Sequence, residues 1–174
     1  KKIGEEPPPE LFSPINKKTE ILSYQPIDKI TPVIDGRLTY FYEWYNAGYA
    51  DVKRMGGTMQ RFAGLITTVY CGFDEKNLYI RFDVINHDIA SYEYAINFYK
   101  PQNLKITLDK PGDILFNIEE IGEVAIPLSL VNIGDEEMIE FAISAREKGT
   151  EVDRTPLLRF SIRLKDTSLY NWTV

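Results

Sequence analysis

Alternation of apolar and polar residues, interrupted at short intervals by turn residues, is the feature that most constrains the fold. Residues 78–85 (LYIRFDVI) carry this pattern most clearly, with one face apolar and the other formed by Tyr79, Arg81 and Asp83. A period of two is typical of a half-buried strand. The preceding residues 64–73 (GLITTVYCGF) are rich in β-branched and aromatic types, and residues 74–77 (DEKN) supply turn chemistry. The two segments together predict a β-hairpin.

Six further segments have strand character and are separated by turn signals. They are residues 93–99, 103–108, 114–118, 121–126, 138–146 and 157–164. No helical pattern is long enough to cover a parallel sheet. About eight short strands therefore predict an all-β fold, an antiparallel β-sandwich of jelly-roll or immunoglobulin-like type. A short helical segment is expected near residues 40–54, and a single helical turn at residues 128–133.

The first 32 residues differ in composition from the rest of the chain. Six of the ten prolines lie there, and proline resists both helices and central strands. We expect residues 1–32 to form an interdomain linker or strap, and residues 33–174 to form a β-sandwich domain of a longer protein. Because residues 1–32 hold many apolar side chains, part of this segment should pack along a folded surface.

Charge excludes two classes of partner. Lys and Arg number 20 against 26 Asp and Glu, which gives a net charge of −6. An acidic chain lacks the basic face that nucleic acids or anionic membranes require. No apolar run approaches the roughly 20 residues of a membrane span. We therefore expect neither nucleic acid nor membrane as a partner.

Cysteine and histidine are too few for much of enzyme and metal chemistry. Cys71 and His87 are the single examples of their types, so an internal disulfide or a thiolate zinc cage cannot form. No cofactor is expected. A Ca²⁺ site built from Asp109, Asp113 and the acidic residues of 119–123 is the weaker alternative. Cys71 is expected to pack as a small apolar residue.

An aromatic cluster at residues 40–49 is the strongest candidate binding feature. It contains six of the 22 aromatic residues in ten positions. A pyranose ring stacks its C–H face on an aromatic ring and needs polar partners for its hydroxyls. The candidate carbohydrate-binding residues are therefore Trp44, Tyr42, Tyr45, Glu43 and Asn46, with Trp172 as a second platform. The alternative is that the segment folds back and plugs one end of the sandwich, a common use of aromatic residues.

Several motifs resemble one known domain. They are PVIDG at residues 32–36, EW at 43–44, AG at 47–48, GGTM at 56–59 and YCGFDEKNLYIRFD at 70–83. This string resembles the C-terminal β-sandwich domain of family-57 glycoside hydrolases, the amylase, 4-α-glucanotransferase and amylopullulanase group. The ending NWTV is similar to the W-x-V ending of such proteins, which would make Val174 the natural C-terminus. Gln60 stands where the family pattern has histidine. The opening pattern is also similar to family-9 carbohydrate-binding modules and DOMON-like sandwiches.

The resemblance implies a non-catalytic, carbohydrate-binding accessory domain of an α-glucan-active enzyme. Its partners would be an α-glucan or another saccharide, and the upstream catalytic domain of the same chain. No catalytic residue is transferred, because the catalytic carboxylates of these enzymes belong to the upstream barrel. Three alternatives stay open: a docking or oligomerisation domain without a ligand, a haem-binding domain of the DOMON kind, and an independent hydrolase.

Overall fold

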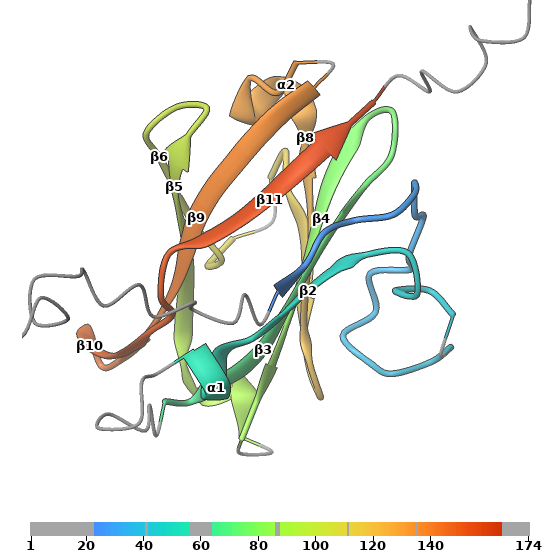
Figure 1. Cartoon of the computed structure of the whole chain (residues 1–174). Helices are drawn as coiled ribbons and strands as arrows, with labels where there is room; N and C mark the ends of the chain where they lie inside the picture. Colours follow the sequence, from blue (N-terminus) through green and yellow to red (C-terminus); the bar gives the residue numbers. More distant parts are fainter. Residues whose placement is uncertain are drawn as a thin grey trace, which may run out of the picture.

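The computed structural model describes residues 23–40, 42–55, 64–85, 88–110, 112–134 and 136–164. Two antiparallel sheets pack face to face (Figure 1). The first, sheet A, has the strand order β1-β2-β3-β4-β8-β7. Its strands are β1 (Ser23–Tyr24), β2 (Gly48–Asp51), β3 (Ile66–Phe73), β4 (Asn77–Val84), β7 (Leu115–Ile118) and β8 (Gly122–Pro127).

The second sheet, sheet B, has the order β10-β9-β5-β6, and β11 also pairs with β9. Its strands are β5 (Glu93–Lys100), β6 (Leu104–Thr107), β9 (Glu136–Glu147), β10 (Thr150–Arg154) and β11 (Leu158–Arg163). Short helical turns η2 (Ile89–Ser91) and α2 (Leu128–Val131) lie in connections between the two sheets, and a third, α1 (Val52–Met55), lies between β2 and β3 of sheet A. The predicted antiparallel β-sandwich is therefore confirmed.

The predicted strands match the observed ones closely. The eight predicted segments correspond to β3 through β9 and to β11, and the helical turn expected at residues 128–133 is α2. Three short strands, β1, β2 and β10, were not predicted. The helix expected near residues 40–54 is the single turn α1 at the end of that range, while the aromatic residues before it lie in turns and in β2.

Turn residues fix the registers of two hairpins. The Asp74 Oδ1 atom accepts hydrogen bonds from the backbone N–H groups of Lys76 (2.7 Å) and Asn77 (2.6 Å), which closes the β3–β4 turn. Between β9 and β10, Lys148 and Gly149 both have positive φ angles, 50° and 81°. This is the backbone that a two-residue hairpin turn needs.

The main core lies between the two sheets. The inward residues of β4 and β8 meet aromatic residues of sheet B, with the Phe82 and Tyr94 ring centroids 4.7 Å apart. Within sheet B, the Phe141 and Phe160 rings stack with their centroids 5.9 Å apart. Cys71 is fully buried in this core, as expected. Each sheet thus buries one face against the other.

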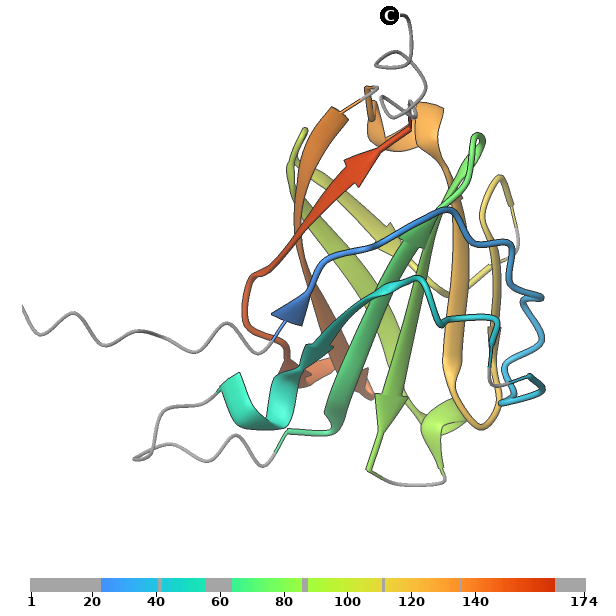
Figure 2. The ribbon, with the colours of Figure 1, turned by 45° about the vertical axis from the view of Figure 1, so that its right-hand side comes forward.

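The segment between β1 and β2, residues 25–47, covers the outer face of sheet A and is called the covering segment below. In Figure 2 it runs in blue and cyan across the front of the sheet, turns beside β7 and β8, and returns to β2. Residues 23–32, which the sequence assigned to the linker or strap, thus lie against the sandwich. At its start the Gln25 amide reaches the edge of β11. Gln25 Oε1 accepts from the Ser161 N–H (2.7 Å), and Gln25 Nε2 donates to the Arg159 carbonyl (3.3 Å).

Candidate functional site

A second, smaller hydrophobic cluster lies under the covering segment. Ile30, Trp44 and Ala47 pack on Tyr79 and Ala125, which point outward from β4 and β8. Strands β4 and β8 are therefore buried on both faces. The cluster anchors the covering segment and places its remaining side chains beside the sheet.

Glu123 of β8 is the polar centre of this covered face. Its side chain is fully buried. Oε2 accepts hydrogen bonds from the backbone N–H groups of Asp35 (3.1 Å) and Gly36 (2.9 Å), and Oε1 accepts one from Trp44 Nε1 (3.1 Å). Burial raises the pKa of Glu123, although these three donors act in the opposite direction. The carboxylate thus ties the covering segment to the sheet.

A pocket of about 600 Å³ opens between the covering segment and the outer face of sheet A. Six of its lining residues are aromatic, and the one charged residue in the lining is Arg81. Its lining consists of Tyr24, Gln25, Ile27, Leu38, Tyr40, Trp44, Tyr45, Ala47, Tyr49, Tyr70 and Arg81. The size falls within the range of about 300–1,000 Å³ that is typical of small-molecule sites.

Arg81 supplies the charged group of the pocket. Arg81 is 7% exposed. Its guanidinium donates to both carboxylate oxygens of Asp83, from Nε at 2.9 Å and from Nη2 at 3.1 Å. The guanidinium carbon also lies 4.5 Å from the centroid of the Tyr70 ring. Because Asp83 compensates its charge, Arg81 presents hydrogen-bond donors rather than a strong positive field.

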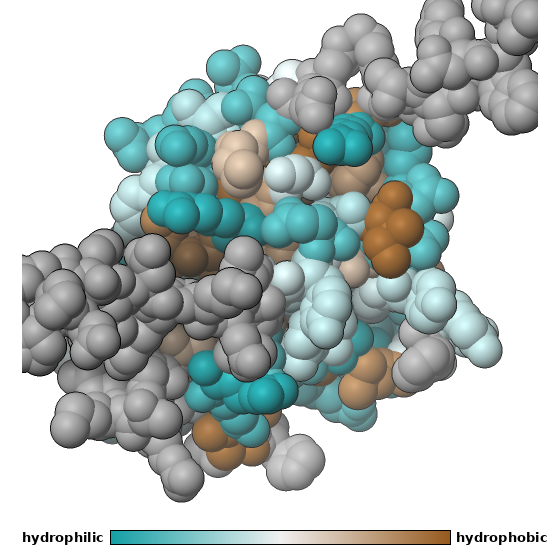
Figure 3. All heavy atoms as spheres, viewed as in Figure 1, coloured by the Kyte–Doolittle hydropathy of each residue, from teal (hydrophilic) through white to brown (hydrophobic). Residues whose placement is uncertain are grey.

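Aromatic rings line the pocket from its base to its rim. The centroid of Tyr70 lies 5.3 Å from that of Tyr49 and 6.2 Å from that of Trp44, and Tyr24 lies 6.3 Å from Tyr49. Burial raises the pKa of Tyr49 and Tyr70, so both phenols keep their hydroxyl proton at neutral pH. Tyr45, at the rim, is 67% exposed. Figure 3, drawn in the view of Figure 1, shows apolar residues scattered among hydrophilic ones on the visible face of the molecule.

The structure brings two of the predicted carbohydrate-binding residues into this pocket. Trp44 lines it and is 6% exposed, so it is both a wall of the pocket and part of the second cluster, and Tyr45 stands at the rim. Tyr42 is 78% exposed and lies beside Tyr45, with ring centroids 6.4 Å apart, but does not line the pocket. Glu43 and Asn46 are half-buried and also lie outside the lining. Trp172 lies outside the described residues.

Sequence reasoning missed the residues that the sheet contributes. Tyr49, Tyr70 and Arg81 point outward from β2, β3 and β4, and the alternation of residues 78–85 correctly put Arg81 opposite the core face. An outward position usually means solvent. The available signal was the outward series of Tyr49, Tyr70, Tyr79 and Arg81, which is unusually aromatic for a solvated face.

Among the described residues, neither a metal-binding group nor the remaining sequence candidates form a second candidate site. Within the described residues, no group of three or more His, Cys, Asp or Glu side chains comes close enough to hold a metal ion. Cys71 lies in the core, where burial raises the pKa of its thiol far above the usual range. The positions of His87 and of residues 56–60, which include Gln60, fall outside the described part of the chain.

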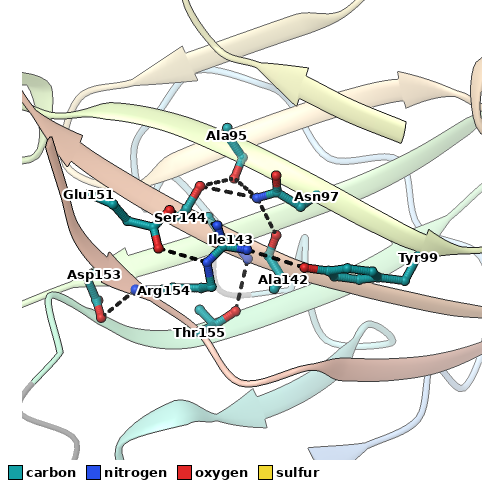
Figure 4. Close-up of polar contacts among 10 residues, drawn as sticks. All are labelled: Ala95, Asn97, Tyr99, Ala142, Ile143, Ser144, Glu151, Asp153, Arg154 and Thr155. Carbon is teal, nitrogen blue, oxygen red and sulfur yellow. Dashed lines mark hydrogen bonds and ion pairs between the residues drawn. The ribbon is translucent and has the colours of Figure 1, made fainter. Parts of the chain in front are cut away.

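The outer face of sheet B carries a polar network (Figure 4). Arg154 donates to both carboxylate oxygens of Glu151 (2.9 and 2.7 Å) and to the Tyr99 hydroxyl (3.3 Å). Beside it, Asn97 Nδ2 donates to Ser144 Oγ (3.2 Å). These contacts join β5, β9 and β10 and engage the guanidinium from two directions. We infer that the network stabilises sheet B, and we place the candidate site on sheet A.

None of the helices in the described residues is long and apolar enough to cross a membrane. The candidate site in the described part of the chain is the aromatic pocket, in which Arg81 is paired with Asp83. Comparison with known proteins assigns no family, since no protein-family model, curated protein or solved structure matches this chain.

Proposed function

We propose that this chain is a non-catalytic accessory domain of an α-glucan-active glycoside hydrolase, and that it binds saccharide in the aromatic pocket of sheet A. The observation that carries the proposal is the convergence of Trp44, Tyr45 and Tyr70 around Arg81 in a pocket of about 600 Å³. Ring faces suit the C–H surface of a sugar, while guanidinium N–H groups and phenolic hydroxyls suit its hydroxyls.

Charge favours a neutral saccharide over an acidic one. Asp83 engages the guanidinium of Arg81, and the buried carboxylate of Glu123 lies opposite Arg81 in the register of β4 and β8. The net charge of −6 also repels anions. An α-glucan fits these conditions and agrees with the resemblance of the sequence motifs to the family-57 domain. We assign no catalytic residue, because the proposal leaves the reaction to an upstream domain.

The direct test is affinity electrophoresis through gels that contain glycogen or soluble starch. We expect the wild-type protein to be retarded and Tyr45→Ala to lose most of the retardation, because this exposed ring stands at the pocket rim. Tyr42→Ala is the matched control, since it removes a neighbouring tyrosine that is even more exposed and does not line the pocket. Unretarded wild-type protein, or equal losses in both variants, would overturn the proposal for this pocket.

A docking role is the second candidate, and one observation favours it. Ile27 and Leu38 at the pocket rim are large apolar residues that are mostly exposed. Such side chains are common where a surface meets another protein. The partner would be the upstream catalytic domain. In this case, Ile27→Ser should make the connection between the two domains of the full-length chain more sensitive to limited proteolysis, without changing migration in glucan gels.

A further inference from the structure

The carboxylate of Glu123 receives donors from two separated parts of the covering segment. Oε2 accepts from the N–H groups of Asp35 and Gly36, where the segment turns beside β8, and Oε1 accepts from Trp44 Nε1, where it returns. All three partners are N–H donors that have no acceptor to offer in return. This arrangement favours an ionised carboxylate, because three donors and no acceptor are directed at its oxygens.

The charged neighbours of Glu123 do not replace these bonds. Arg81 faces it from β4 but is held by Asp83. Arg37 of the covering segment pairs with Glu119. Asp35 raises the pKa of Glu123, and Glu120 follows in the β7–β8 turn. No ion pair to Glu123 is present within the described residues, so its charge is held by neutral donors in a buried site.

Trp44 links this carboxylate to the pocket. Its indole N–H bonds to Glu123, while the same residue forms a wall of the pocket and lies 6.2 Å from the Tyr70 ring centroid. The next residue, Tyr45, stands at the rim. Whatever sets the orientation of Trp44 therefore also sets the shape of the aromatic wall. Nothing in the pocket lining other than the indole makes a hydrogen bond to Glu123 among the described residues.

We propose that Glu123 is the positioning residue of the pocket: its ionised carboxylate fixes Trp44 and the turn at residues 35–36 on sheet A, and saccharide capture weakens when this carboxylate takes a proton. The statement about capture rests on the proposed function, whereas the statement about Trp44 does not. Burial raises the pKa of Glu123, so this carboxylate takes a proton at a higher pH than an exposed glutamate does. Asp35 titrates lower, because hydrogen bonds from Thr39 and the Arg37 N–H lower its pKa.

A purely structural carboxylate predicts a different result. Because the pKa of Glu123 is raised on folding, its contribution to stability is present below the unfolded value and is lost as pH rises through the folded value. Acidification therefore does not unfold the protein through this group. Positioning predicts that binding weakens on acidification while the molecule stays folded, whereas a structural role predicts that binding is constant among folded molecules.

The experiment measures saccharide affinity between pH 4 and pH 8 for wild type, Glu123→Gln and the control Glu120→Gln. Glu120 is an exposed carboxylate three residues before Glu123 in the chain. We expect wild type and the control to lose affinity together as pH falls. Glu123→Gln should bind about tenfold or more weakly at pH 7, as expected for loss of hydrogen bonds to a charged group, and should show no such pH dependence. Equal affinity and equal pH profiles in all three would overturn the proposal.

Tryptophan emission gives a readout that needs neither saccharide nor a Glu123 variant. In a Trp172→Phe background, Trp44 is the remaining tryptophan. Its emission should titrate with an apparent pKa above that of an exposed glutamate, while circular dichroism stays constant. If wild type binds no saccharide, the proposed function fails and this titration still decides whether Glu123 positions Trp44. Emission that is constant down to the pH of unfolding would overturn the positioning role.

Discussion

The absence of a side chain at Gly72 of β3 leaves the space in which Ile30 of the covering segment packs. A Cβ atom built on Gly72 would lie 2.2 Å from Ile30 Cδ1 and 2.6 Å from Ile30 Cγ1. Ile30 is buried, so its side chain has little room to turn, and its backbone N–H donates to the Phe73 carbonyl (2.9 Å), which holds the main chain in place. The missing side chain at position 72 is therefore a requirement of the packing rather than of the backbone.

Gly72→Ala should destabilise the protein by about 1–3 kcal/mol, the usual cost of overpacking. Alanine normally improves a strand position by about 0.5–1 kcal/mol relative to glycine, so a net loss measures the clash. In an Ile30→Ala background both offending carbons are absent, and Gly72→Ala should cost close to nothing. The coupling between the two changes should thus reach about 1–3 kcal/mol.

Urea unfolding followed by circular dichroism measures the four free energies of this cycle. Gly112→Ala is the matched control, because a Cβ there meets no atom within 4 Å. The control should change stability by less than about 0.5 kcal/mol or raise it slightly. The packing argument is refuted if Gly72→Ala costs the same with and without the Ile30 side chain. It is equally refuted if Gly72→Ala is as harmless as the control.

Three further predictions follow from buried or hydrogen-bonded groups. The pKa of Asp74 is lowered: burial raises it, but hydrogen bonds from the Tyr79 hydroxyl (2.7 Å) and two backbone N–H groups outweigh the effect of burial. The contribution of Asp74 to stability is therefore present above its unfolded pKa and is lost as pH falls through the folded value. Asp74→Asn should therefore reduce the loss of Tm between pH 5 and pH 2. Cys71 should react with a thiol reagent such as Ellman's reagent at the rate of global unfolding, because its thiol is buried and its pKa is raised; fast labelling of native protein would contradict this. Tyr94 has a buried hydroxyl without a hydrogen-bond partner in the described structure, so Tyr94→Phe should leave Tm unchanged or raise it. A loss of more than about 1 kcal/mol in the free energy of unfolding would show that this hydroxyl has a partner.

Local sequence patterns were sufficient for the strands that form the main core. Alternation identifies a strand wherever one face is apolar, as in β4 and β9. The three missed strands lack this signal: β1 has two residues, β2 (GYAD) contains Gly48 and Asp51, and β10 (TEVDR) is mostly polar. β1 and β2 form because β3 presents a free edge, which is a tertiary cause, and β10 forms as the second strand of the β9–β10 hairpin. Propensity cannot report such a cause.

The pocket was predictable in part for a similar reason. The aromatic cluster was visible, and Trp44 and Tyr45 do line a pocket. The burial of Arg81 and Glu123 was not visible, because both stand on the outward face of alternating strands, where solvent is the usual surrounding. A segment up to about 90 positions away in sequence covers them. Contacts of that separation depend on the path of a connection rather than on a local period.

The Gln25 contact with β11 has a bearing on how this chain behaves in concentrated solution. A strand at the border of a sheet displays unpaired amide and carbonyl groups, which invite pairing with another molecule. Gln25 offers one side-chain amide to this border, at the Ser161 N–H and the Arg159 carbonyl, and so imitates one residue of an added strand. A chain shortened beyond residue 26 would present β11 uncapped. We expect self-association through β11 if the N-terminus is trimmed to residue 33, the predicted start of the β-sandwich domain.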